Sequence, residues 1–346
     1  MMRVAILVLM LIEVLNKIVI CRCYASLIRY SNIGAICDFL NKKIKVFDSA
    51  MINVFAYMML VAIWSTTPLA IKWSAAELSF SGGIFWRILL SAVLAFCLLK
   101  IRRERLFFRP GLGYFYFVAS MGIAPNFLMV YWASLSIPSG LIAVMFSTTP
   151  FVIGILSYFW LGNNVFTLKR VIALSISIVG LGVIFSDQMV VAGDRGVYGI
   201  FAMLVSILSF SVSTTWMQKV GADIPILQTT AGGLIFSVPL LAIFWWVFDG
   251  TSPFNVSFLG GASIIYLSVV GSLIGFLLYY FLLHRITAYL ASTVGMISPV
   301  FAMSLGVLVA GEEFGAQLLL GAFLVLTGVG LYHIKSSLLR FPRVSK

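Results

Sequence analysis

The succession of long apolar runs constrains the fold of this chain more than any other feature of its sequence. Ten runs of about 18 residues or more stand between charged or turn-forming breaks, and a helix of that length crosses the hydrocarbon core of a bilayer. The runs lack the alternation of a membrane β-strand, and lipid offers backbone groups no partner, so each run is expected to be a helix. The ten expected spans are residues 51–71, 80–99, 112–134, 139–161, 168–186, 196–217, 225–248, 257–283, 288–310 and 316–334.

The composition excludes a water-soluble globule. Of the 346 residues, 62% are hydrophobic and 10% are charged, whereas about a quarter of the residues of a soluble domain are charged. A globule of this size could not hide so much apolar surface from water. We therefore predict an all-α integral membrane protein with ten transmembrane helices, embedded in the lipid bilayer.

The net charge of +12 is distributed over short loops rather than gathered in one patch, which argues against nucleic acid as a partner. Short cytoplasmic loops carry an excess of Lys and Arg. With the start of the first span and the C-terminus in the cytoplasm, thirteen basic residues fall on the inner side and two on the outer side. The inner residues are Lys100, Arg102, Arg103, Arg105, Arg109, Lys169, Arg170, Lys219, Arg285, Lys335, Arg340, Arg343 and Lys346, and the outer residues are Lys72 and Arg195.

An internal repeat divides the chain into two similar parts. MLVAIWS at 59–65 returns as MLVSILS at 203–209, and an offset of 149 pairs Tyr131 with Tyr280, Pro150 with Pro299, and Gly162 with Gly311. The repeated unit therefore contains five helices. The predicted repeats cover residues 51–187 and 196–335.

Because five is odd, the second copy is expected to enter the membrane from the opposite face. The loop charges agree with this inversion, since the loop after the second span carries five basic residues and its counterpart, FDGTSPFNVS, carries none. Inverted repeats are typical of secondary transporters, whose substrate site lies near the bilayer midplane between the halves. The sequence thus predicts a carrier that works by alternating access.

Residues 1–50 have no counterpart in the second half. Glu13, Asn16 and Lys17 interrupt the first apolar stretch on one helical face, which is typical of an interfacial amphipathic helix or a poorly ordered extension rather than a span. Met51 lies so close to the start of the repeat that we expect it to be the native start. Residues 336–346 form a basic cytoplasmic tail.

Arg87 is the only full charge well inside an expected span. Insertion scales put the cost of a mid-span Arg at about 2.5–3.5 kcal/mol, so such residues usually face the protein interior and have a task. A functional Arg87 would attract a carboxylate or a phosphate. An arginine that snorkels or ties helices together is the alternative.

The first and sixth spans offer polar side chains at matching depths. Trp64 and Thr67 precede Pro68, whose missing N–H frees a carbonyl of the preceding turn, and Thr214 is their counterpart. Hydroxyl residues in membranes often serve only helix packing, but their coincidence in both halves favours a substrate pathway. Lys72 closes the first span at the expected outer mouth, either as a site residue or as an interfacial anchor.

Further pathway candidates lie in the third and eighth spans. Asn126 stands where the second copy has Gly275, so its amide is either a substrate contact or a link between helices. Pro150 and Pro299 are expected to bend the fourth and ninth spans and to let the halves rock. Aromatic rings at matched depths would line a path or pack the core, and these are Tyr131, Trp132, Tyr279 and Tyr280.

The expected spans contain no central Asp or Glu. Proton-driven carriers usually need a membrane-embedded carboxylate or histidine, so we predict facilitated transport or exchange with weak proton coupling. An intramembrane transferase, the rival from a different class, would need positioned acid, base or metal groups, and the spans lack them. We therefore predict a protein that is not an enzyme and that holds no cofactor and no metal.

Four stretches together resemble the ten-helix EamA-type drug/metabolite transporters, over about residues 51–335. They are IWSTTPLAIKWS, FWRILLSA, ASLSIPSGLIAVMFSTTP and GEEFGAQLLLGAFLVLTGVGLY. The chain departs from the family pattern at Ser65, where a glycine is usual, and at Asn163 and Asn164, where the second half has Glu312 and Glu313.

The resemblance implies a transporter of the bacterial cytoplasmic membrane that exports a small metabolite, such as an amino acid or a related amphipathic compound. An exchanger of a phosphorylated or nucleotide-linked anion is the second expectation, supported by Lys72 and Arg87. A small-molecule substrate is the expected partner, and a homodimer is left open.

Overall fold

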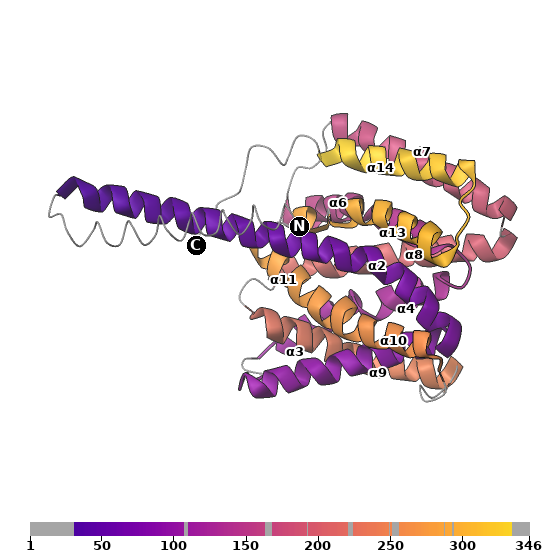
Figure 1. The fold of residues 1–346 in the computed structure, drawn as a ribbon, viewed down its shortest axis with the longest axis horizontal. Coiled ribbons are helices and arrows are strands. Elements are labelled where there is room, and N and C mark those ends of the chain that lie inside the picture. The colour runs from indigo at the N-terminus through magenta and orange to yellow at the C-terminus, as the bar shows by residue number, and fades with distance from the viewer. Residues whose placement is uncertain are drawn as a thin grey trace. The chain divides into compact units, whose positions relative to one another are not determined.

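The computed structural model describes residues 31–106, 110–162, 168–191, 193–220, 224–248, 250, 256–286, 288–292 and 294–333. The chain divides into two compact units, Met1–Phe55 and Ala56–Lys346, and the account below concerns the second. Every regular element of the described residues is a helix, as Figure 1 shows. The prediction of an all-helical chain is thus confirmed for these residues.

Helix α2 covers the first two apolar runs and residues 31–50 before them, and the other helices fall on the apolar runs singly or as consecutive pieces. Their bounds are α2 Ser31–Ile101, α3 Leu112–Met121, α4 Ala124–Ala133, α5 Ser139–Phe146, α6 Thr149–Leu161, α7 Leu168–Val191, α8 Gly193–Val220, α9 Ile226–Phe248, α10 Phe258–Tyr266, η2 Leu267–Ile274, α11 Gly275–Arg285, α12 Ala288–Ser292, α13 Val294–Ala310 and α14 Ala316–His333.

Six helical segments of the described residues are long and apolar enough to cross a membrane. They are Ile52–Ile101, Leu112–Ala133, Ser139–Leu161, Asp194–Val220, Ile226–Phe248 and Phe258–Arg285. Three shorter apolar helical stretches are Val171–Ile184, Ser298–Ala310 and Ala316–Leu331.

The backbone of α2 leaves helical geometry at Leu78 and Ser79. Ser79 has a φ of 61°, which a residue with a Cβ adopts only at a cost. Glu77 lies at this break, and its carboxylate accepts hydrogen bonds from the Ser257 backbone N–H (3.1 Å) and Oγ (2.6 Å). Ser257 in turn caps α10 by accepting from the Gly260 N–H, so the break in α2 is tied to the start of α10.

Several apolar runs are divided into two pieces. The break between α3 and α4 falls at Gly122 and Ile123, and a proline follows in the first turn of α4. A similar break separates α5 from α6, where Pro150 occupies the first turn of α6. A proline fits the first helical turn because that turn needs no N–H donor. The run of the eighth expected span stays continuous, but it contains the π-helix η2.

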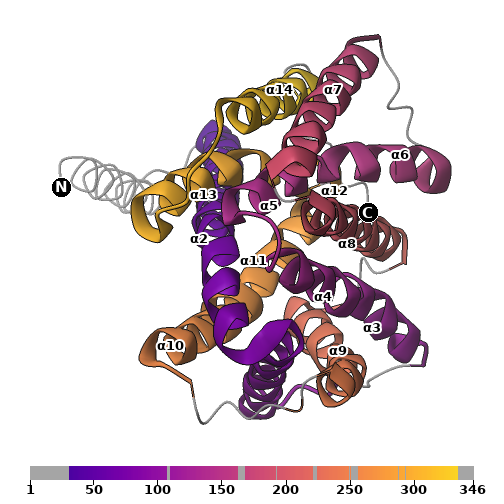
Figure 2. The same ribbon diagram turned by 90° about the vertical axis from the view of Figure 1, so that its right-hand side faces the viewer.

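Helices from the first half of the chain pack on helices from the second half. The closest pairs are α3 with α9, α4 and α6 with α8, α5 with α13, and α7 with α14. Figures 1 and 2 show α7 and α14 side by side and α3 next to α9. Asn126 of α4 takes part in one such contact, because its Oδ1 accepts a hydrogen bond from Ser206 Oγ of α8 at 2.6 Å.

The predictions for the two chain ends concern residues that lie largely outside the described part of the chain. The expected amphipathic helix within residues 1–30 and the basic tail at 336–346 lie there. The backbone of residues 31–50 is helical and belongs to α2, which begins at Ser31. The described helix therefore includes the twenty residues that precede the first expected span.

Candidate functional site

A cavity lies inside the unit Ala56–Lys346, and the space between its walls amounts to about 740 Å³ when the part open to solvent is included. Its wall combines α2, α4, α5 and the start of α6 with α8, η2, α11, α12 and α13. Both halves of the chain therefore contribute to it. The lining residues are Trp64, Thr67, Pro68, Ile71, Asn126, Phe127, Val130, Ile142, Ala143, Phe146, Thr149, Phe210, Gly271, Phe276, Ser292, Gly295 and Ser298.

The lining is mainly apolar, and no charged side chain is among these residues. Five polar residues interrupt the apolar surface, which is the usual composition of a small-molecule site. Of the groups predicted from sequence, Trp64, Thr67, Pro68 and Asn126 line the cavity. Its size and chemistry suit a small amphipathic molecule.

Three aromatic rings pack against one another across the two halves, and two of them, Trp64 and Phe210, line the cavity. The ring centroids of Trp64 lie 5.4 Å from Tyr279 and 6.1 Å from Phe210, and Phe210 lies 5.4 Å from Tyr279. The Tyr279 hydroxyl and Thr214 Oγ1 are hydrogen-bonded at 2.9 Å, and both residues are buried. The predicted pathway residues Trp64, Thr214 and Tyr279 are therefore brought together.

We expect Thr214→Val and Tyr279→Phe to be coupled in stability. Either single substitution leaves the other group without its buried partner, whereas the double variant removes both groups. Hydrogen bonds between membrane helices contribute about 0.6 kcal/mol on average and about 1.7 kcal/mol at most, so a coupling within this range is expected from a double-mutant cycle. Thermal unfolding of the purified variants measures it, and strictly additive effects would contradict the contact.

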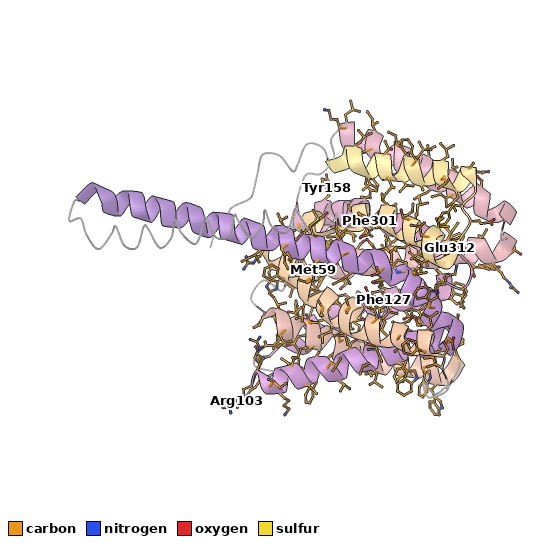
Figure 3. All side chains as sticks on the ribbon, viewed as in Figure 1. Met59, Arg103, Phe127, Tyr158, Phe301 and Glu312 are labelled. Atoms are coloured by element: carbon orange, nitrogen blue, oxygen red, sulfur yellow. The ribbon has the colours of Figure 1, made fainter. Side chains whose placement is uncertain are left out.

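Arg87 is completely buried beside the cavity. Its Nε donates a hydrogen bond to Ser272 Oγ at 2.8 Å, and its guanidinium carbon lies 4.3 Å from the centroid of the Phe127 ring. Phe127 lines the cavity, and Figure 3 shows its position in the interior of this unit. The terminal nitrogens Nη1 and Nη2 have no hydrogen-bond partner.

Lys72, Glu312 and Ser139 form a charged network that joins α2, the segment between α13 and α14, and the start of α5. Lys72 Nζ donates to Glu312 Oε1 at 2.6 Å. The Ser139 N–H donates to the same oxygen at 3.1 Å, and Ser139 Oγ donates to Oε2 at 2.9 Å. The Glu312 side chain is 5% exposed and that of Lys72 is 39% exposed.

The network fixes the ionised state of Glu312. Burial raises the pKa of this carboxyl, but the hydrogen bonds from Lys72 and Ser139 outweigh burial, and the pKa lies below its ordinary value. Figure 3 shows Glu312 toward one end of the unit and Arg103 toward the other. Lys72 is thus paired with an acid, a contact that the sequence reasoning did not anticipate.

The remaining predicted candidates are distributed differently. Tyr131 is buried and its hydroxyl accepts a hydrogen bond from Ser74 Oγ at 3.1 Å. Tyr280 is buried with its ring stacked on Phe276. Trp132 is 39% exposed and is not among the lining residues. Consecutive helical residues point about 100° apart, so Tyr131 and Trp132 cannot both face inward.

The two matched prolines lie next to lining residues. Pro150 follows Thr149, and Pro299 follows Ser298. Pro150 stands in the first turn of α6, just after a helix break, whereas Pro299 lies inside α13. Their local geometries therefore differ.

The sequence reasoning missed several residues of this region. Phe127 and Ser272 contact the Arg87 side chain, and Glu312, which Ser139 holds, pairs with Lys72. The repeat offset of 149 also pairs Gly122 with Gly271, and this pairing was a signal for Gly271, which lines the cavity. Among the described residues, no group of three or more His, Cys, Asp and Glu side chains could hold a metal ion.

A family model and several known proteins are similar to this chain. The model of the EamA-like transporter family matches residues 51–186 and 197–333. "Uncharacterized transporter YoaV" of Bacillus subtilis is 25% identical over 272 residues, which cover 77% of this chain and 91% of that protein. "Protein PagO" of Salmonella typhimurium is 25% identical over 292 residues, which cover 81% and 95% respectively.

A solved structure titled "Crystal structure of protein" has a similar fold, with a TM-score of 0.60. It is 17% identical in sequence, and the match covers 81% of this chain and 95% of that one. At this identity the likeness concerns the fold alone.

Proposed function

Because the chain belongs to the EamA-like transporter family, we propose that it exports a small amphipathic metabolite, such as an amino acid or a related compound, by alternating access. The family and the names of the relatives indicate a membrane transporter and not an enzyme. An intramembrane transferase is therefore not retained. The bacterial cytoplasmic membrane is the proposed location.

The cavity between the two halves carries this proposal. Secondary transporters bind their substrate near the midplane, at the interface of two repeats, and expose it alternately to either side. Here α2, α4 and α5 face α8, η2, α11 and α13 around one cavity. A change in the packing of these helices would open the cavity toward one side and close it toward the other.

We propose ten membrane crossings in two inverted repeats, residues 51–187 and 196–335. The segment Ile52–Ile101 has 50 residues, so at about 1.5 Å per residue it is more than twice as long as a hydrocarbon core of about 30 Å. Its break at Leu78 and Ser79 supports two crossings. The three shorter apolar helices supply three more. Gly162 and Gly311, paired by the repeat, both have a left-handed backbone, with φ of 66° and 63°.

The proposed orientation places the start of the first span and the C-terminus in the cytoplasm. It rests on the excess of basic residues in the loops assigned to the inner side. The network of Lys72, Glu312 and Ser139 then lies toward the outer side. We propose that this network closes the cavity on that side, so that the described conformation accepts a substrate from the cytoplasm.

A flux measurement tests the function. We expect cells that produce the protein to release one or more amphipathic metabolites faster than cells without it. Ala143→Phe should fill part of the cavity and suppress this release, whereas Ala62→Phe, at an exposed position of α2, should not. Equal release with and without the protein across a broad metabolite panel would contradict an export function.

We expect a pH gradient alone to drive little transport. None of the residues that line the cavity is acidic or a histidine, so the described lining offers no group that binds a proton and the substrate in turn. In proteoliposomes, imposing a pH gradient should change the initial flux of an identified substrate by less than about twofold, compared with about tenfold or more for a coupled carrier. Strong uphill accumulation under a pH gradient would refute weak coupling.

A further inference from the structure

We propose that Arg87 is the docking site for the anionic group of the substrate, and that this group is a carboxylate on a largely apolar body. The proposal rests on the proposed transport function and narrows its substrate class. Arg87 is a buried charged residue of the described core, and no acidic side chain takes part in its hydrogen bonds; the proposal assigns it a role.

The charge of Arg87 is held in place but is not neutralised. Its Nε donates a hydrogen bond to Ser272 Oγ, and its guanidinium carbon lies over the Phe127 ring. Its terminal nitrogens Nη1 and Nη2 make no hydrogen bond within the usual distance. Its electrostatic neighbours are the hydroxyl groups of Tyr131 and Tyr266, of which Tyr131 also interacts with the guanidinium as a hydrogen-bonding group, and neither is a carboxylate. A buried charge without a compensating partner is strongly destabilising, so a bound anion would stabilise this site.

The free nitrogens lie directly behind the cavity wall at Gly271. A Cβ built on Gly271 would stand 3.5 Å from Arg87 Nη2 and 3.7 Å from Thr67 Oγ1. Gly271 and Thr67 both line the cavity. The space that a side chain would fill at Gly271 therefore connects the cavity lining with the guanidinium.

The local backbone is unusual at this point. Gly271 and Ser272 belong to the π-helix η2, Leu267–Ile274, and π-helical turns are rare and frequent at functional sites. The main-chain carbonyl of Ser268 in the same element accepts a hydrogen bond from Ser91 Oγ, one turn after Arg87 in α2. The π-helix thus presents both the opening at Gly271 and the Nε acceptor to the same arginine.

A carboxylate matches this site better than a phosphate. Nη1 and Nη2 form a planar fork that binds a carboxylate with two parallel hydrogen bonds. A phosphate monoester carries a charge of about −1.5 to −2 at neutral pH, and the cavity lining supplies no second cation. The lining contains no acidic group that would pair with an ammonium, so the carboxylate and the apolar body are expected to supply the recognition.

Four probes with the same aromatic body test the proposal on the purified full-length protein. They are 3-phenylpropionate, phenylalanine, phenethylamine and phenyl phosphate, and binding is measured by thermal stabilisation and calorimetry. We expect both carboxylates to bind and phenethylamine to bind at least about tenfold more weakly, the factor of one charge-assisted hydrogen bond. Tighter binding of phenyl phosphate than of 3-phenylpropionate would overturn the carboxylate assignment.

Two variants connect the binding to Arg87. Arg87→Gln should weaken 3-phenylpropionate binding by about tenfold or more and leave phenethylamine unaffected. Gly271→Ala keeps Arg87 and meets only ordinary contact distances, the nearest being Leu267 Cδ2 at 3.4 Å, so it should fold, cover the guanidinium and weaken the carboxylates selectively. Arg87→Lys should restore only part of the affinity, because it keeps the charge without the fork.

Matched controls separate the site from general effects. Gly275→Ala lies one turn further along the same continuous helix, also meets only ordinary contact distances, and is not part of the lining. Arg102→Gln removes the same charge at an exposed position. Both should bind 3-phenylpropionate normally. If carboxylates still bind to both Arg87→Gln and Gly271→Ala, the docking site is wrong, even if the protein transports a substrate. If carboxylates bind selectively but no flux is measured, the docking site stands and the proposed transport function is contradicted.

Discussion

Glu312→Gln is expected to open the cavity toward the side on which Lys72 lies and to slow transport by about tenfold. The substitution removes the charge that Lys72 and Ser139 share. Hydrogen bonds to charged groups contribute about 1.5–3 kcal/mol, and the 39% exposure of Lys72 places the expected loss at the lower end. A loss of about 1.4 kcal/mol shifts a two-state equilibrium tenfold.

Cysteine labelling measures the opening. In a background in which Cys21, Cys23, Cys37 and Cys97 are replaced, Ala143→Cys places a reporter in the cavity lining. An impermeant maleimide added outside should label it faster in the presence of Glu312→Gln. Glu313→Gln is the matched control, because it removes the neighbouring, exposed carboxylate, and equal labelling in the two variants would mean that the network does not close the cavity.

The pH dependence of this closure has a definite sign. The pKa of Glu312 is lowered in the closed conformation by Lys72 and Ser139, despite burial. A lowered pKa means that the ionised form stabilises the closed state, fully above the ordinary carboxyl pKa and progressively less as the pH falls through the lowered value. Because the thiolate fraction of the reporter itself changes with pH, the measured quantity is the ratio of external labelling with Glu312 intact to that in Glu312→Gln. This ratio should be constant between about pH 6 and pH 8, above the ordinary carboxyl range, and should rise toward one only under acid conditions.

Gly180→Val is expected to destabilise the protein by about 1–3 kcal/mol, the usual cost of overpacking a tight contact. A Cβ at Gly180 would lie 2.8 Å from the Gly321 carbonyl oxygen and 2.8 Å from the Val325 nitrogen. These are backbone atoms of α14, which cannot move without separating the two helices. The close approach also lets Ser177 Oγ donate to the Val325 carbonyl at 3.2 Å.

Gly182→Val is the control for this prediction, because it lies two residues further along α7 and a Cβ there would meet nothing within 4 Å. The same loss of glycine and the same β-branched side chain should then cost little. Thermal unfolding in detergent should show a melting temperature several degrees lower for Gly180→Val than for Gly182→Val. Equal melting temperatures would show that the packing of α7 on α14 does not limit stability.

The helical fold was predictable because it follows from the length of the apolar runs and from the lack of backbone partners in lipid. The breaks inside these runs were less predictable. Nothing in the residues of η2 distinguishes a π-helix from an α-helix, and the contact of Ser272 with Arg87 joins segments that are far apart in the sequence. The break before α4 was signalled only by its proline in the first turn.

The site was predictable only in part, because its contacts join residues that are far apart in the sequence. The mid-span position of Arg87 predicted a special role from the cost of its charge, but its partners lie on elements distant in sequence, such as Ser272, 185 residues away. Lys72 and Glu312 are 240 residues apart, so their pairing requires the three-dimensional arrangement. Trp132 was predicted at the same depth as Tyr131. Because neighbouring residues of a helix point in different directions, Tyr131 is buried and Trp132 lies at the surface.

The most direct test of the account is the sidedness of two equivalent loops, one from each half. Single cysteines at Arg103 and Asp249, in the background without native cysteines, would be labelled in right-side-out and inside-out vesicles with an impermeant maleimide. The account predicts that the cysteine at 103 reacts only from the cytoplasmic side and the cysteine at 249 only from the outer side. Reaction of both positions from one side would contradict the inverted arrangement and, with it, the shared cavity as a transport path.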